Sequence, residues 1–217
     1  MDSFGLIGHP VSHSHSPALF RKAFGEDVVY DLIDCGSFNE AWTRFVSGPY
    51  RAVNVTAPFK EDAALKADVR GSEVERCGAA NILLKKDGVI VARNSDYLGV
   101  RALLRRLVCR FPTRPSCAVI GFGGAGKAAF AAAEDEGLAP SLYRHDGIGN
   151  GVAADIVLFT LPRRVPGCEL IRCAVLVEAN YLDPVFSGDA PEGGYVYISG
   201  EEWLESQFRE GLEFFKI

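Results

Sequence analysis

Short apolar runs alternate with amphipathic segments along the first half of the 217-residue chain. Three runs read as strands: Phe4–Ile7, Val28–Ile33 and Ala52–Val55. The segments Ala18–Phe24 and Phe38–Val46 lie between them and suit helices. Alternation of strands and helices is typical of α/β proteins, so the pattern predicts an α/β fold.

A hairpin is predicted next, from the runs Asn81–Leu84 and Val89–Ala92. They are joined through Lys86-Asp87-Gly88, and Asp-Gly is a strong signal for a tight turn. After Asp96 a helix is expected to about Leu107, because apolar residues recur at the i, i+3, i+4, i+7 spacing of one helix face. That face comprises Val100, Leu103, Leu104 and Leu107.

The segment Phe111–Pro115 has two prolines that end this helix, and a new unit is expected behind it. The buried-type strand Cys117–Ile120 leads into the glycine-rich loop Gly121–Gly126, and the helical run Lys127–Glu136 follows. Strand, glycine loop and helix in this order suit a dinucleotide, since backbone amides and a helix N-terminus can meet a pyrophosphate. The alternative is a simple tight turn.

Amino-acid composition and net charge indicate the class of protein but no particular binding partner. With 48% hydrophobic and 24% charged residues the chain is expected to be soluble and globular. A net charge of −5 gives no general attraction to nucleic acid or to anionic membranes. No apolar run approaches the ~20 residues of a membrane helix, and the N-terminus has no signal-peptide layout, so we expect no membrane partner and a cytoplasmic location.

The cysteines and histidines predict no metal site. None of the six cysteines forms a C-x-x-C pair, and we expect reduced, mostly buried thiols. His9, His13 and His15 crowd one loop, but their spacing fits neither a helical i, i+4 pair nor a known zinc layout.

The segment Asn54–Lys60 sets an amide, a hydroxyl and an ammonium around Pro58 at the end of a predicted strand. Proline fixes its own φ and restricts the residue before it, so Thr56 and Lys60 leave the strand in defined directions. A lysine held in this way can act as a general acid or base. The alternative is a solvated lysine in front of a helix that opens at Glu61.

Six ordered segments between residues 8 and 207 together resemble one family. They are Gly8–Pro17, Asn54–Lys60, Gly78–Asn81, Asn94–Gly99, Gly121–Gly126 and Trp203–Gln207. The chain resembles the shikimate dehydrogenases, which reduce 3-dehydroshikimate with NADPH. The chain departs from the usual family pattern at two of these segments. Asn94-Ser95-Asp96 stands where the family usually has Asn-Thr-Asp, and Trp203-Leu204 stands where it usually has Met-Leu.

The resemblance implies roles for residues of the first unit and of the C-terminal helix. Lys60 and Asp96 would be the catalytic pair, although an aspartate at a helix start is also a common N-cap. Ser14 and Ser16 would hold the substrate carboxylate, although serines before a helix also serve as turn or capping residues. The remaining substrate-binding residues would be Thr56, Asn81, Tyr181 and Gln207.

The same resemblance implies a cofactor site, in a domain that is shorter here than is usual in the family. Its residues would be Gly121, Gly123, Gly124, Ala125, Gly126, Arg144 and Thr160. Arg144 matches the family arginine that meets the 2′-phosphate of NADP, whereas Asp146 after the strand leaves NAD open. Only Asp146–Gly151 stands where a full crossover helix is usual, so one layer of the sheet is expected to be uncovered or reorganised.

We therefore expect a substrate-binding catalytic domain from residues 1–97 and 200–217 and a shortened Rossmann-like NAD(P)-binding domain from residues 98–199. The C-terminal helix would return to the first domain. The expected function is NADPH-dependent, reversible reduction of 3-dehydroshikimate to shikimate by a monomer or homodimer. The alternatives are a non-catalytic binding protein for shikimate-like ligands with a decayed cofactor site, and a quinate/shikimate dehydrogenase that uses NAD.

Overall fold

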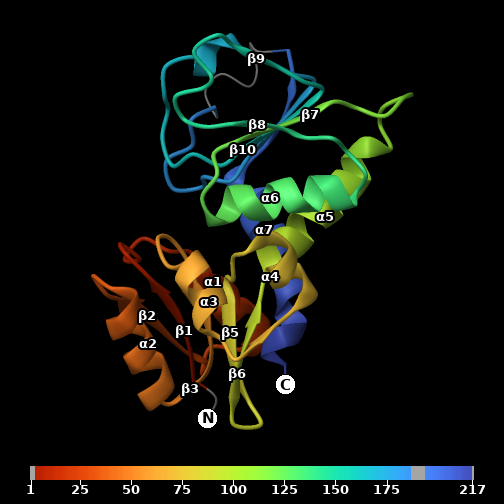
Figure 1. Ribbon diagram of the computed structural model, residues 1–217. Coiled ribbons are helices and arrows are strands. Elements are labelled where there is room, and N and C mark those ends of the chain that lie inside the picture. Colours follow the sequence, from red (N-terminus) through yellow and green to blue (C-terminus); the bar gives the residue numbers. More distant parts are fainter. Residues whose placement is uncertain (1–2, 187–193, 217) are drawn as a thin grey trace. The chain divides into compact units, whose positions relative to one another are not determined.

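The computed structural model describes residues 3–186 and 194–216 and confirms the predicted α/β fold (Figure 1). The chain divides into two compact units. Unit 1 comprises Met1–Ser95 and Gly211–Ile217, and unit 2 comprises Asp96–Glu210. The sequence predicts domain boundaries at 97/98 and 199/200, whereas the structure has them at 95/96 and 210/211. The C-terminal helix is therefore part of unit 2 in the structure up to Glu210.

Unit 1 is built on a six-stranded mixed sheet in the order β2-β1-β3-β5-β6-β4, drawn in red to yellow-green in Figure 1. Strands β1, β2 and β3 are parallel to one another, and β5 runs antiparallel to β3. The strands are β1 (Ser3–Gly8), β2 (Val29–Asp34), β3 (Tyr50–Val55), β4 (Val69–Arg70), β5 (Ile82–Lys86) and β6 (Val89–Arg93). The helices are α1 (Ser16–Phe24), α2 (Phe38–Ser47), α3 (Lys60–Lys66) and α4 (Ser72–Cys77).

The predicted hairpin is confirmed as β5 and β6. Its two turn residues both have positive φ, 51° at Asp87 and 82° at Gly88. Backbones with positive φ at both central positions match the twist of the strands they join, which is why Asp-Gly is a reliable signal.

Alternate residues of the unit 1 strands fill two separate cores. Ile7 and Val53 face a core that they share with Phe45 of α2 and Ala63 of α3. Phe4 instead lies 5.6 Å, between ring centroids, from Phe20 of α1. Successive side chains of a strand point to opposite faces, so the sheet is covered on both sides.

Unit 2 contains a five-stranded sheet in the order β13-β12-β10-β7-β8, with every pair parallel. These strands are β7 (Cys117–Ile120), β8 (Ser141–Tyr143), β10 (Ile156–Phe159), β12 (Val175–Glu178) and β13 (Val196–Ile198). The three central strands are buried at every position, as expected for a parallel sheet covered on both faces. Helix α6 (Gly124–Asp135) packs on the sheet through buried alanines, and α5 (Ser95–Val108) and α7 (Gly200–Gly211) complete the helices of this part of the chain.

The second face of this sheet has no α-helix between β8 and β12 within the described residues. A short parallel pair, β9 (Val152–Ala153) and β11 (Ile171–Arg172), and the 3₁₀ turn η1 (Cys168–Leu170) lie there instead. Ile148, Cys168 and Phe186 are buried against strand residues such as Phe159. The expected reorganisation of one layer is therefore confirmed, because loops with apolar anchors replace the crossover helix.

Helix α7 packs on α5 at a position where α5 has no side chain. A Cβ on Gly99 would lie 2.7 Å from the backbone nitrogen of Gln207, so only glycine permits this approach. The Ser206 hydroxyl donates to the Gly99 carbonyl at 3.0 Å. Both helices consequently count with unit 2, apart from their end residues Ser95 and Gly211.

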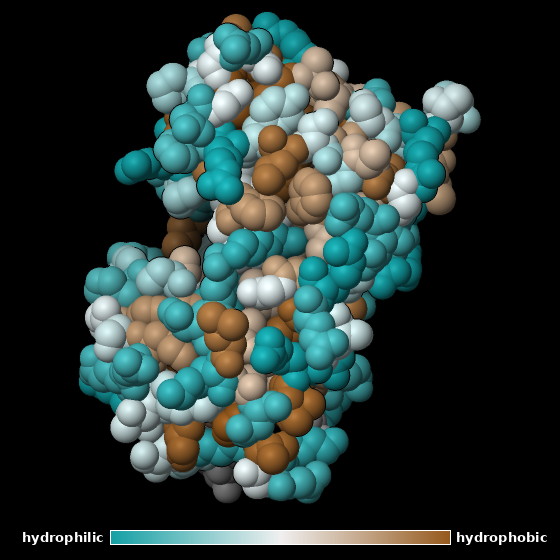
Figure 2. All heavy atoms as spheres, viewed as in Figure 1, coloured by the Kyte–Doolittle hydropathy of each residue, from teal (hydrophilic) through white to brown (hydrophobic). Residues whose placement is uncertain are grey.

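On the face shown in Figure 2, apolar residues occur in small groups separated by polar ones. The most exposed large apolar side chain among the described residues is Leu65 of α3. No helix in the described part of the chain is long and apolar enough to cross a bilayer.

A charged cluster holds α5 to the end of α6. Arg101 and Arg105 of α5 both donate to Glu136, at 2.7 and 3.0 Å. Burial raises the pKa of Glu136, but the hydrogen bonds from Arg105 and Arg101 outweigh that effect and the pKa is lowered. A lowered pKa in the folded state means that the ionised carboxylate stabilises the fold.

We predict that Glu136→Gln lowers the free energy of unfolding at pH 7 by about 1–3 kcal/mol. Because the folded pKa lies below the unfolded value of about 4.3, the stabilisation is present above that pH and is lost as the pH falls through the folded pKa. Urea unfolding at pH 7 and below pH 4 measures this. Glu205→Gln, at an exposed position of α7, is the control, and an equal gap between wild type and Glu136→Gln at both pH values would contradict the prediction.

Candidate active site

The loops that follow β1 and β3 are held together at the carboxyl ends of these parallel strands. The amide of Thr56 donates to the Ile7 carbonyl at 2.8 Å, and the amide of His9 donates to the Ala57 carbonyl at 3.1 Å. A Cβ on Gly8 would lie 2.3 Å from Cγ2 of Thr56, so the close approach requires glycine there. The carboxyl ends of parallel strands are where α/β proteins bind ligands.

Ser14 and Ser16 lie next to each other at the start of α1. The Ser14 hydroxyl donates to the Ser16 hydroxyl at 3.1 Å, and it accepts from the Ser16 amide at 3.2 Å. Both side chains are half-buried. Ser14 thus serves the local turn, and the two hydroxyls still form a pair at a helix N-terminus, where a carboxylate is favoured.

Lys60 is the first residue of α3 and is half-buried. Its carbonyl accepts from the amide of Ala80 at 2.8 Å, and the amide of Val55 donates to the carbonyl of Asn81 at 2.8 Å. The turn after β3 and the segment before β5 are therefore bound to each other. This brings Thr56, Lys60 and Asn81 to one end of unit 1.

The side chain of Asn81 is buried and paired with Ser95. Its amide nitrogen donates to the Ser95 hydroxyl at 3.0 Å, and its amide oxygen accepts from the Ser95 backbone at 2.7 Å. Asn94 is fully buried and donates to the Ala79 carbonyl at 2.7 Å. These bonds fix the start of α5, immediately before Asp96.

Asp96 is the second residue of α5, so the N-cap alternative does not apply to it. Its side chain is buried, with a relative exposure of 4% for the residue. The indole nitrogen of Trp203 donates to Oδ1 of Asp96 at 3.3 Å. The sequence shows Trp203 only as a departure from a family pattern, and nothing in it indicates this contact across 107 positions.

The glycine loop of unit 2 has the shape of a phosphate cradle. Gly121 has a φ of +100°, and a Cβ on Gly126 would lie 2.2 Å from the Gly121 carbonyl oxygen. A Cβ on Gly123 would meet nothing within 4 Å, so the loop is open at that position. The loop leads directly into α6 at Gly124, and a helix N-terminus is a position where an anion is favoured.

Thr160 and Arg144 lie at the same edge of the sheet as the loop. The Thr160 hydroxyl donates to the Ile120 carbonyl at 2.9 Å, and Gly121 packs directly against it. The guanidinium carbon of Arg144 lies 5.8 Å from the ring centroid of Phe122, and the ammonium of Lys127 lies 5.7 Å from the same centroid. Phe122 and Lys127 were not predicted from the sequence, and the Phe122 ring lies near two cationic side chains, those of Arg144 and Lys127.

Tyr181 is half-buried in the loop that follows β12. The buried Glu178 holds this loop by accepting from the amide of Val185 at 2.6 Å and from the hydroxyl of Tyr197 at 2.7 Å. Burial raises the pKa of Tyr197, and the hydrogen bond that its hydroxyl donates to Glu178 raises it further. Asn180 donates to the Pro162 carbonyl at 3.0 Å, which ties the loop to the segment after β10. The role of Glu178 was not predicted.

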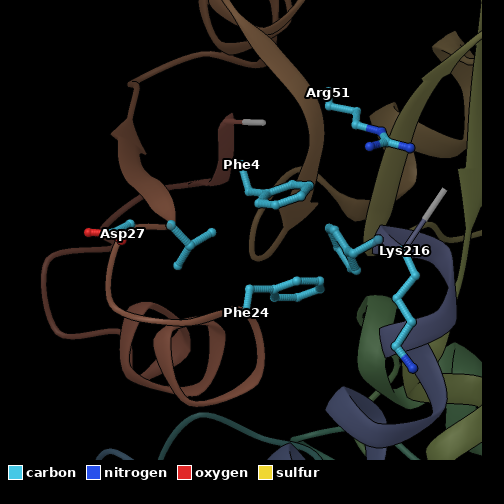
Figure 3. Close-up of a pocket in the computed structure, with 7 residues that line it drawn as sticks. Phe4, Phe24, Asp27, Arg51 and Lys216 are labelled. Atoms are coloured by element: carbon cyan, nitrogen blue, oxygen red, sulfur yellow. The ribbon is translucent and has the colours of Figure 1, made fainter. Parts of the chain in front are cut away.

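A separate pocket of about 440 Å³ lies in unit 1, away from the predicted site residues (Figure 3). Its lining residues are Phe4, Phe24, Asp27, Val28, Arg51, Phe215 and Lys216. Figure 3 shows that the charged ends of Asp27 and Lys216 point away from the phenylalanine rings. The pocket is thus mainly a gap between apolar side chains.

The histidines and cysteines of the described residues are potential metal ligands by residue type. Within the described residues no three His, Cys, Asp or Glu side chains come together as potential metal ligands. His9 instead pairs with Asp34, at 2.6 Å between Nδ1 and Oδ1. The prediction of reduced thiols is confirmed, since all six cysteines are free and four of them are buried.

The fold and these residues define a two-unit α/β protein whose second unit is of the dinucleotide-binding type. Residues 6–83 match the family model described as "Shikimate dehydrogenase substrate binding domain". The N-terminal unit is therefore similar to the substrate-binding domain of the shikimate dehydrogenases.

Individual relatives extend this similarity beyond the matched segment. The chain is 35% identical over 147 residues to the "Shikimate dehydrogenase (NADP(+))" of Hahella chejuensis, covering 64% of this chain and 53% of the relative. It is 37% identical over 141 residues to the protein of the same name from Ignicoccus hospitalis, covering 61% and 52%. The chain thus spans about half the length of the curated relatives it matches.

A solved structure extends the similarity to both units. The shikimate 5-dehydrogenase of Thermus thermophilus in complex with shikimate is matched with a TM-score of 0.79 at 26% identity. The match covers 99% of this chain and 91% of that one. The shortened unit 2 therefore keeps the fold of this relative.

Two glycine variants test the cradle separately from the fold. We predict that Gly126→Ala destabilises the protein by about 2–4 kcal/mol, because its methyl group would clash with the Gly121 backbone. Gly123→Ala should leave stability unchanged, because its Cβ enters open space, but should weaken NADPH binding by about tenfold or more.

Thermal unfolding and a fluorescence titration with NADPH measure the two effects. The matched pair is informative because both changes add one methyl group to the same loop. Unchanged NADPH affinity in Gly123→Ala would show that the loop does not hold a phosphate.

Proposed function

We propose that this chain is a shikimate dehydrogenase that reduces 3-dehydroshikimate reversibly with NADPH. The observation that carries the proposal is the combination, in one chain, of a unit that matches the shikimate dehydrogenase substrate binding domain and a second unit with an open glycine loop. The names of the relatives, which specify NADP, and the shikimate complex of the Thermus protein support it.

Reduction of a ketone requires a proton donor near the carbonyl oxygen. Negative charge develops on that oxygen as hydride arrives, and an ammonium both stabilises and protonates it. Lys60 is proposed as this group, since the backbone bonds around it fix the start of α3. Asp96 is proposed to orient the lysine and to hold a substrate hydroxyl.

The substrate carries a carboxylate and several hydroxyls, which need different partners. The adjacent hydroxyls of Ser14 and Ser16 at the start of α1 suit the carboxylate. Thr56, Asn81, Tyr181 and Gln207 are proposed to bind the hydroxyls or, for Tyr181, the carboxylate. In this division unit 1 supplies most of the substrate contacts.

The residues of unit 2 fit a dinucleotide, which when bound supplies the hydride. Gly121, Gly123, Gly124, Ala125 and Gly126 would hold the pyrophosphate, and Thr160 supports that loop from the end of β10. Arg144 would meet the 2′-phosphate, which favours NADP over NAD. Asp146, the residue that left NAD open, lies exposed in the loop after β8.

A second candidate function is binding of a shikimate-like ligand without turnover. One observation favours it, namely that no α-helix lies between β8 and β12 in the described residues, so the crossover of a dinucleotide-binding unit is abridged there. NADPH oxidation on addition of 3-dehydroshikimate separates the two functions. Shikimate binding without turnover with either nicotinamide cofactor would reject the enzyme and retain the binding protein.

Free thiols throughout the chain suit a reducing compartment, and we propose that the protein works in the cytoplasm. A monomer or a homodimer is compatible with this function.

We predict that Lys60→Ala lowers kcat by ~10²–10⁴ fold, the usual effect of losing a general acid, with shikimate affinity largely kept. Steady-state kinetics and a shikimate titration measure the two quantities. Lys66→Ala is the matched control, because Lys66 is an exposed lysine at the other end of the same helix. Turnover near the wild-type rate in Lys60→Ala would remove this residue from the mechanism.

We also predict that Arg144→Ala weakens NADPH binding by about 10–100 fold, since charge-assisted hydrogen bonds contribute about 1.5–3 kcal/mol. NADH binding should change little, because NADH has no 2′-phosphate. Titrations of both cofactors against wild type, Arg144→Ala and the exposed control Arg106→Ala measure this. Equal weakening for NADH and NADPH would contradict a contact with the 2′-phosphate.

A further inference from the structure

We propose that Trp203 is a positioning residue, whose indole N–H holds the Asp96 carboxylate in its reactive orientation. This inference rests on the proposed function, because it gives Asp96 a role in the reaction. It goes beyond the resemblance, in which Trp203 stands where methionine is usual and has no assigned role.

The contact is buried on both sides. Trp203 and Asp96 each have a relative exposure of 4%. The indole nitrogen, which is a donor only, lies 3.3 Å from Oδ1 of Asp96. A carboxylate removed from water needs hydrogen-bond donors, and an indole supplies one in a fixed direction with no charge of its own.

The helices that carry the two residues cannot slide past each other. One turn beyond Asp96 on α5 lies Gly99, and one turn beyond Trp203 on α7 lies Ser206, whose hydroxyl donates to the Gly99 carbonyl at 3.0 Å. The absence of a side chain at Gly99 brings the backbone of Gln207 against α5. The Trp203–Asp96 and Ser206–Gly99 bonds thus form two contacts one turn apart, which fix the indole relative to the carboxylate.

The bond from Trp203 affects the reaction through the orientation of the Asp96 carboxylate. A donor on Oδ1 selects one rotamer of Asp96 and leaves Oδ2 to its other partners. Small losses of orientation at a reacting group lower the rate strongly, even when the ligand still binds. Methionine at position 203 would fill space but has no N–H to donate.

The first part of the test measures turnover. Trp203→Phe keeps an aromatic ring and removes the donor. We expect kcat to fall about tenfold, with the KM for NADPH close to that of wild type and the variant fully folded at the assay temperature, although its melting temperature is lower because a buried acceptor loses its donor. Trp42→Phe, which alters the other tryptophan of the chain, on α2 of unit 1, should leave kcat unchanged.

The second part does not depend on turnover. The chain has two tryptophans, so Trp42→Phe leaves Trp203 as the single indole reporter. We expect its emission to differ between Trp42→Phe and Trp42→Phe/Asp96→Asn without ligand. We also expect shikimate to change the emission of Trp42→Phe and to change it less in the double variant.

The outcomes separate this inference from the proposed function. Wild-type kcat in Trp203→Phe, or identical ligand-free emission with and without Asp96→Asn in folded protein, would overturn the role of Trp203 while leaving the dehydrogenase intact. A melting temperature so low that Trp203→Phe is partly unfolded at the assay temperature would also overturn it, because loss of folded protein would then explain the lower kcat. Trp203 would in that case have a structural role. Absence of NADPH oxidation in wild type would instead reject the proposed enzyme, and the positioning role with it.

Discussion

Backbone pairing of parallel strands is the constraint on which both units depend, because it puts the loops after neighbouring strands at one edge of a sheet. In unit 1 it brings the loop after β1 to the turn after β3, where the Thr56 and His9 amides bond across. In unit 2 it brings the glycine loop after β7 beside the ends of β8 and β10. Polar residues far apart in sequence thereby gather at one edge of each sheet.

Unit 2 shows how a parallel sheet remains covered when a crossover helix is lost. Loops anchored by Ile148, Cys168 and Phe186 bury the strand residues that a helix would otherwise cover. The buried Glu178 satisfies the amide of Val185 and thereby fixes the loop that carries Tyr181. The glycine loop keeps its geometry because it depends on β7, Thr160 and α6, none of which the abridgement alters.

Local signals in the sequence predict the long strands, the hairpin and the glycine loop because each rests on neighbouring residues. The pattern misses α4 and β4, which are six and two residues long, because they are stabilised by distant partners. Glu73 of α4, for example, pairs with Arg93 of β6. It also starts α6 too late, since Gly124 and Gly126 have low helix propensity and are helical because of the loop they close.

In the candidate site, too, single segments are predicted from the sequence, whereas contacts between distant segments are not. Motifs indicate Lys60, Asp96 and the glycine loop as single segments, whereas the contacts that orient them join positions far apart. The bond between Trp203 and Asp96, the Gly99–Gln207 approach and the pairing of Arg144 with Phe122 all depend on how helices and loops pack. Periodicity along the chain carries no information about such contacts.

Hydride transfer itself is the most direct test of the central claim. The protein is incubated with 3-dehydroshikimate and NADPH deuterated at the transferable position of the nicotinamide, and the product is examined by mass spectrometry. A dehydrogenase predicts shikimate that carries deuterium on the newly formed carbinol carbon. Bound but unreduced 3-dehydroshikimate, with all deuterium retained in the cofactor, would contradict the proposed function.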